Sequence, residues 1–148
     1  MSKHLSDSSE QQAAEAYILK SLEQVLGLHF DPGAVLPIEV EVKPDAIDPV
    51  NKVVVELYAR VGKVKGGQLQ KLKGDILKLA LIGKNLGEGW RKILCFASDE
   101  AAKYVQGESW VAEAARAFEV EVHVMPLPSE QENKVIAAQR RQRMVNPT

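Results

Sequence analysis

Cysteine, histidine and aromatic residues are scarce in this chain of 148 residues, and each scarcity excludes a class of chemistry. The one cysteine, Cys95, cannot form a disulfide within the chain or supply a cysteine-rich metal site. It lies in an apolar run and is predicted to be a buried strand residue. The three histidines, His4, His29 and His123, are scattered, which argues against a zinc site and against a Ser/His/Asp triad.

Long hydrophobic runs are also lacking. No run approaches the ~20 apolar residues that a membrane-spanning helix needs, and the polar N-terminus does not resemble a signal peptide. With the single cysteine, these absences predict a cytoplasmic protein that has no membrane partner. The remaining composition, 45% hydrophobic over 148 residues, is sufficient for one domain with a real core.

The charge of the chain is nearly balanced but unevenly placed. The net charge is −1, yet the segment 52–92 holds ten basic and three acidic residues, a local net charge of +7. The rest of the chain, with nine basic and seventeen acidic residues, carries −8. Such asymmetry indicates either an anion-binding face or lysines that only solvate a helix and its loops.

Hydrophobic periodicity predicts an α/β fold, a mixed β-sheet flanked by helices. We expect disorder over 1–9, one α/β domain over 10–128 and a charged, loosely attached helix or tail over 129–148. Val25 is expected on the buried stripe of the first helix, and Asp48 and Pro49 in a hairpin turn. The predicted helices are 10–26, 68–82, 98–105 and 108–118, and the predicted strands are 36–43, 45–47, 53–59, 90–97 and 120–125.

Two acids near the middle of the chain suggest chemistry. Asp45 follows Pro44 and precedes the strand 53–59, in which alternation sends Val53, Val55, Leu57 and Ala59 to the core. Glu56, Tyr58 and Arg60 then share the opposite face. Asp45 and Glu56 would lie on neighbouring strands, close enough to share an ion. The alternative interpretation is that Asp45 caps a turn and Glu56 is the exposed half of an alternating strand.

Two carboxylates on adjacent strands are the smallest set of acidic ligands expected for a Mg²⁺ site. The ion neutralises phosphoryl oxygens and helps to deprotonate water. The backbone carbonyl of Leu57 would be a further oxygen ligand. Glu15, at the edge of the apolar stripe of the first helix, either ends the core or points at the same site.

Pro44-Asp45, ten intervening residues and then Glu56-Leu57-Tyr58 resemble the motif of the PD-(D/E)xK nuclease superfamily, which includes restriction endonucleases and Holliday-junction resolvases. The resemblance spans roughly 10–124 and implies a restriction endonuclease-like core. It further implies that Asp45 and Glu56 bind Mg²⁺, with Mn²⁺ as a substitute, supported by Glu15. Many enzymes of this kind act as homodimers, so the resemblance also implies that this chain forms a homodimer.

The sequence departs from the motif at Tyr58, which stands where the family has a catalytic lysine. A tyrosine hydroxyl is neutral at pH 7 and orients water without supplying a fixed positive charge. Some members of the superfamily take this group from a following helix or loop. Lys71, beside Gln68 on the polar stripe of the helix 68–82, is the first candidate, followed by Lys63 and Lys65; the alternative is a solvated lysine.

The basic residues predict a nucleic-acid partner, DNA first, with RNA not excluded. Contacts of this kind to backbone phosphates are salt-dependent and indifferent to sequence. Trp90 and Trp110 are candidates to stack on bases, but the core is the more common place for a tryptophan. The rival hypothesis, favoured by Tyr58, is an inactive nuclease-fold module that binds nucleic acid or protein and oligomerises. The expected nucleic-acid-binding residues are Arg60, Lys63, Lys65, Gln68 and Lys78.

Overall fold

A computed structural model describes residues 2–145, and the side chains over 8–144. Over these residues the order of elements is α1-β1-β2-α2-β3-α3-η1-α4-β4-α5, where η1 is a 3₁₀ turn. Their bounds are α1 Ser2–Leu26, β1 Ala46–Asp48, β2 Val53–Tyr58, α2 Gly67–Leu86, β3 Arg91–Phe96, α3 Asp99–Ala102, η1 Lys103–Val105, α4 Trp110–Ala117, β4 Val120–Val124 and α5 Ser129–Val145.

The strands form one mixed four-stranded sheet in the order β1-β2-β3-β4. β1 and β2 are an antiparallel hairpin, in which Ala46 lies opposite Val55. β3 and β4 each run parallel to the preceding neighbour, with Tyr58 opposite Phe96 between β2 and β3. The predicted α/β class, with a mixed sheet flanked by helices, is therefore confirmed, as is the turn at Asp48 and Pro49 between the first two strands.

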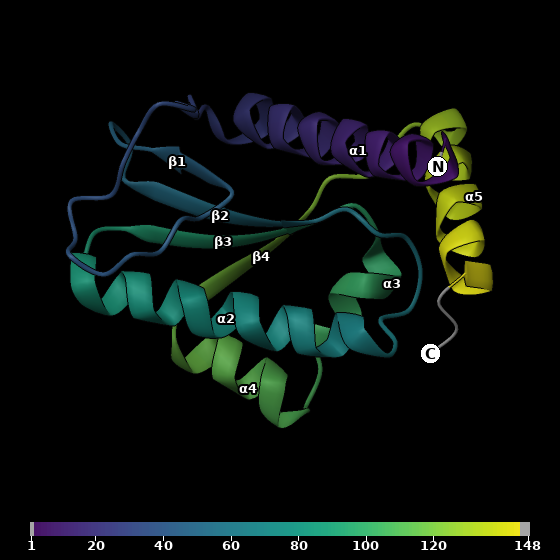
Figure 1. The fold of residues 1–148 in the computed structure, drawn as a ribbon. Coiled ribbons are helices and arrows are strands. Elements are labelled where there is room, and N and C mark those ends of the chain that lie inside the picture. Colours follow the sequence, from purple (N-terminus) through teal and green to yellow (C-terminus); the bar gives the residue numbers. More distant parts are fainter. Residues whose placement is uncertain (1, 146–148) are drawn as a thin grey trace.

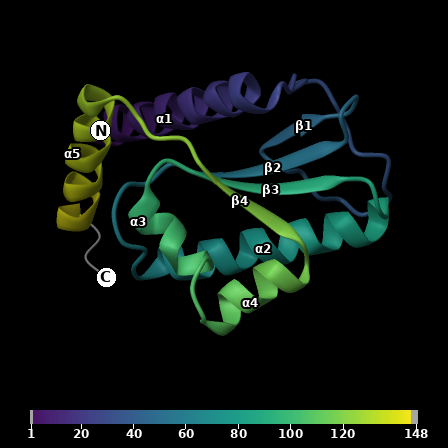
Figure 2. The same ribbon diagram turned by 180° about the vertical axis from the view of Figure 1, so that it is seen from behind.

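Helices cover both faces of the sheet, so β2 is buried on both sides. Figures 1 and 2 show α1 on one side and α2, α3 and α4 on the other, with α5 beside α1 at one end of the molecule. On the α1 side, Val53, Val55 and Leu57 pack with Ile18 and Leu22. On the α2 side, the core is formed by Val54, Tyr58, Leu94, Phe96, Leu72, Ile76 and Leu79.

The predicted alternation along β2 is correct, but its opposite face is not a polar surface. Tyr58 is 2% exposed and Glu56 is 2% exposed, because α2 crosses over that face. The alternative interpretation of Glu56 as the exposed half of a strand is therefore wrong. A strand buried on both faces is what a parallel crossover through a helix produces.

The strand predicted over 36–43 is absent; within the described residues this segment is irregular. One cause is Pro37, which has no backbone N–H to donate. Another is that the outer edge of β1 is already occupied: the N–H of Asp31 donates to the carbonyl of Ile47 at 2.9 Å. The segment covers the α2-side core through the half-buried Ile38 and Val42 without pairing.

Both terminal helices differ from the expectation. α1 begins at Ser2, where disorder was expected as far as position 9, and Met1 lies outside the described residues. Extending an existing helix needs no new nucleus, which explains how a polar segment continues it. Val25, expected in the core, is 66% exposed. α5 packs beside α1 and buries Val135 and Ala138, whereas we expected loose attachment; 146–148 lie outside the described residues.

The later elements lie close to the predicted ranges. Ser98 accepts a hydrogen bond from the Ala101 N–H and caps α3, as its sequence position predicted. Cys95 is buried in β3, as predicted, and burial raises the pKa of its thiol to about 12. Among residues 2–145, no helix combines the length and apolar character that crossing a bilayer requires.

Asp48 fixes the hairpin that carries the candidate acids. Its fully buried carboxylate accepts hydrogen bonds from the backbone N–H groups of His29, Val50 and Asn51 and from the Asn51 side chain. Burial alone raises the pKa of Asp48, but the bonds from Asn51, His29 and Val50 outweigh it and lower the pKa below its ordinary value. One ionised side chain therefore ties the turn to the segment that follows α1.

We predict that Asp48→Ala lowers the free energy of unfolding by about 3 kcal/mol, because several N–H groups lose their acceptor at once. Since its pKa is lower in the folded state, the contribution of Asp48 is present above the unfolded-state pKa and is lost as the pH falls through the folded-state value. Urea denaturation at neutral and acidic pH measures both effects.

Asp31→Ala is the matched control, since the Asp31 side chain accepts a local hydrogen bond from the Gly33 N–H at an exposed turn. It should shift stability by less than about 1 kcal/mol. Equal effects of the two substitutions would contradict the anchoring role of Asp48.

Candidate metal and nucleic-acid site

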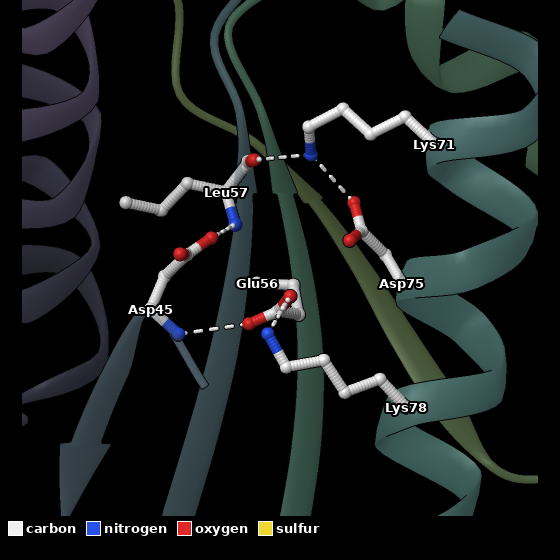
Figure 3. Close-up of polar contacts among 6 residues, drawn as sticks. All are labelled: Asp45, Glu56, Leu57, Lys71, Asp75 and Lys78. Carbon is white, nitrogen blue, oxygen red and sulfur yellow. Dashed lines mark hydrogen bonds and ion pairs between the residues drawn. The ribbon is translucent and has the colours of Figure 1, made fainter. Parts of the chain in front are cut away.

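Two reciprocal hydrogen bonds join the candidate acids across the hairpin (Figure 3). The backbone N–H of Asp45 donates to Glu56 Oε2 at 2.8 Å, and the backbone N–H of Leu57 donates to Asp45 Oδ2 at 2.8 Å. Asp45 itself is exposed, just ahead of β1. The proximity expected for the two carboxylates is thus present, and each is held by the backbone of the neighbouring strand.

Glu56 is a buried carboxylate with a lysine as its partner. Lys78, on α2, places Nζ 2.8 Å from Glu56 Oε1. Burial raises the pKa of Glu56 to about 7; the hydrogen bond and charge of Lys78 lower it, and the charge of Asp45 raises it. Lys78 was expected to contact nucleic acid, but in this structure its ammonium group is directed at Glu56.

Lys71 reaches the same site from the first turns of α2. Its Nζ lies 2.7 Å from Asp75 Oδ2 and makes a long contact of 3.5 Å with the carbonyl oxygen of Leu57. The ammonium group also lies 5.7 Å from the centre of the Tyr58 ring. A fixed positive charge is therefore present next to β2, although the strand itself carries no lysine.

Tyr58 lies beneath α2 and packs against Phe96, with ring centroids 5.5 Å apart. Burial raises the pKa of its hydroxyl, and the adjacent Arg60 offsets part of this rise. The hydroxyl is therefore neutral at ordinary pH. Tyr58 is thus a core aromatic residue, and the positive charge next to β2 comes from Lys71 of α2.

Glu15 approaches from α1, on the other face of the sheet. Burial is the main cause that raises its pKa; a hydrogen bond from Gln11 lowers the pKa, the charge of Asp45 raises it and that of Lys71 lowers it. Glu15 is thus electrostatically coupled to the site. A pocket of about 290 Å³ between α1 and β1 has Asp45 in its lining.

The donor atoms fit a hard divalent cation with few protein ligands. Within the described residues, no three His, Cys, Asp or Glu side chains form a group that could hold a metal ion. An ion here would therefore rely on the carboxylates of Asp45 and Glu56 and the carbonyl of Leu57, with water completing the shell. The ammonium groups of Lys78 and Lys71 already lie against the Glu56 carboxylate and the Leu57 carbonyl, so an ion here would share these oxygens with them.

Four of the expected nucleic-acid-binding residues lie on the loop after β2 or at the start of α2. Lys63 and Lys65 are exposed on the loop between β2 and α2, and Gln68 is half-buried in the first turn of α2. Arg60 is partly engaged, since its Nη1 donates to Gln142 Oε1 at 3.0 Å.

The two tryptophans differ in exposure. Trp90 is half-buried against the α2-side core. Trp110, for which the core was the favoured place, is 69% exposed, and the Lys73 Nζ lies 5.3 Å from the centre of its ring.

Asp75, Gln139 and Gln142 are not among the site residues that the sequence predicts. Asp75 lies on the predicted polar stripe of α2, and its i, i+4 spacing from Lys71 was the available signal. Gln139 and Gln142 contact residues of the loop after β2 that are 78 and 82 positions away along the chain, and no local sequence pattern predicts such contacts.

Comparison with protein-family models, with curated proteins and with solved structures gave no match.

The raised pKa of Glu56 predicts a pH dependence of stability. Between about pH 4.5 and pH 7 the folded state keeps a proton that the unfolded state has released, so the free energy of unfolding falls as the pH rises through this window. Glu56→Gln should remove that fall. Chemical denaturation at a series of pH values measures the slope.

Glu113→Gln on α4 is the matched control, because this side chain is 67% exposed. The control should keep the slope of the unmodified protein over the same pH range. An unchanged slope in Glu56→Gln would show that the buried carboxyl of Glu56 is not its source.

Proposed function

We propose that this chain is a nuclease-like domain that binds DNA and hydrolyses phosphodiester bonds in a Mg²⁺-dependent reaction. The observation that carries the proposal is the pair of reciprocal hydrogen bonds between Asp45 and the Glu56-Leu57 strand, with two lysines of α2 beside it. The hairpin followed by a helical crossover supports a restriction endonuclease-like core of the PD-(D/E)xK type.

Asp45, Glu56 and the Leu57 carbonyl are the groups that would hold the ion. Bound Mg²⁺ supplies charge neutralisation at a phosphoryl group and lowers the pKa of water. Lys78 holds Glu56 in place as an ionised partner, and Lys71 supplies the positive charge that Tyr58 lacks. Asp75 keeps the Lys71 ammonium group directed at this site.

Lys63, Lys65 and Gln68 support a DNA-binding surface around the candidate site. Exposed lysines on a loop bind phosphates without reading sequence. The rival proposal is an inactive nuclease-fold module that binds DNA through the same residues, and Tyr58 is the observation that favours it.

The proposed function predicts that the protein binds a divalent metal ion. Isothermal titration of Mg²⁺ or Mn²⁺ near pH 6.5 should show saturable binding with release of a proton, because a divalent ion beside Glu56 lowers its raised pKa. Two buffers of different ionisation enthalpy reveal the proton. Glu56→Gln should lose both signals, whereas Glu113→Gln should keep them. Binding that is unaffected by Glu56→Gln would place the metal elsewhere.

The proposed function also predicts that the protein cleaves duplex DNA. Activity should require Mg²⁺ or Mn²⁺ and should stop in EDTA. Asp45→Asn and Glu56→Gln should reduce the rate by at least about a hundredfold, and Lys71→Met by a comparable factor. Lys84→Met removes an exposed charge elsewhere on α2 and should leave the rate unchanged. Salt-sensitive DNA binding without cleavage would favour the inactive module.

A further inference from the structure

A second basic surface lies next to the candidate site, on the C-terminal helix. Figures 1 and 2 place α5 at the end of the molecule where the chain leaves β2 and turns towards α2. This connecting loop carries Lys63 and Lys65. α5 therefore flanks the same loop that leads from the candidate acids to Lys71.

Gln139 attaches α5 to that loop in a defined register. Its side-chain amide accepts from the Val61 N–H at 2.8 Å and donates to the Val61 carbonyl at 2.9 Å. Gln142 adds a bond with Arg60 at 3.0 Å. Few apolar residues of α5 are fully buried, Val135 and Ala138 among them, so these polar contacts contribute to fixing its position.

Helical spacing places one exposed arginine on this side of α5 and a second on the neighbouring face. Arg143 lies one turn beyond Gln139, on the same side, whereas Arg140 follows Gln139 directly and lies roughly 100° further round the helix. Both side chains are exposed, and among the ion pairs of the described residues neither guanidinium takes part. After Glu132 the helix contains no acidic residue.

Favourable interaction with the helix dipole is one explanation for basic residues at the end of a helix. A dipole effect, however, does not depend on which side of the helix a residue occupies. The tie between Gln139 and Val61 gives one side a distinct position, beside the loop lysines.

We propose that α5 is an arm that binds the DNA backbone, with Arg140 and Arg143 contacting phosphates of the duplex that reaches Asp45 and Glu56. Gln139 is a positioning residue that holds the arm against the loop after β2. This inference rests on the proposed function, because it extends the same DNA-binding surface onto the last helix.

The test is DNA binding by fluorescence polarisation, with a labelled duplex two helical turns long and EDTA to prevent cleavage. Arg140→Gln/Arg143→Gln should weaken binding about tenfold at about 0.1 M salt and lower the salt slope by about 2, since two phosphate contacts are lost. Lys20→Gln/Lys134→Gln is the matched control: it removes the same charge from exposed positions of α1 and α5 and should change affinity far less.

A double-mutant cycle separates positioning from general stability. Gln139→Ala should weaken DNA binding without changing the charge, and it should have little further effect in the Arg140→Gln/Arg143→Gln background, because it acts through these arginines. A merely structural role would weaken binding equally in both backgrounds and would overturn the assignment of Gln139.

The outcomes distinguish the two proposals. If the unmodified protein does not bind duplex DNA, the proposed function fails, and the arm fails with it. If the unmodified protein binds but the double arginine variant keeps the same affinity and salt slope, the arm is refuted while the proposed function stands. An equal loss in the lysine control would show that only total charge matters and would also refute the arm.

Discussion

The burial of the Glu56 carboxylate is the constraint on which the site depends. A charge inside a sheet that helices cover on both faces is unfavourable unless partners satisfy it. Here a backbone N–H from the segment before β1 and the ammonium group of Lys78 from α2 provide those partners. The hairpin, the strand and the crossing helix are thereby held in one arrangement, and the pKa of Glu56 remains raised to about 7.

The position of α2 follows from the sheet topology and decides the chemistry. Because β2 and β3 are parallel, the chain must cross over one face of the sheet between them, and α2 is that crossover. Its inner stripe packs on the sheet, while one edge carries Lys71, Asp75 and Lys78 over the end of β2. Positive charge thus reaches the acids from the helix. Tyr58, at the end of β2, is buried in the core and packs against Phe96.

The same loop connects the site to the last helix. Val61 lies three residues beyond the end of β2 and forms two hydrogen bonds with one glutamine of α5. A side-chain amide that pairs with a backbone peptide in this way fixes both partners, because both a donor and an acceptor are used. The basic loop and the arginines of α5 consequently have a defined relation, although α5 has only a small buried apolar surface.

The sequence by itself determined the class of fold and most of the elements, because apolar periodicity depends on which residues face a core. It also predicted that Asp45 and Glu56 would be neighbours, since a turn at Asp48 and Pro49 pairs the flanking segments. Tertiary structure decided that Asp31 pairs with the outer edge of β1 at Ile47, which together with Pro37 explains why 36–43 forms no strand. It also decided that Lys78 pairs with Glu56 and that Gln139 bonds to Val61. These pairs are 22 and 78 residues apart in the sequence and meet only when helices pack on the sheet.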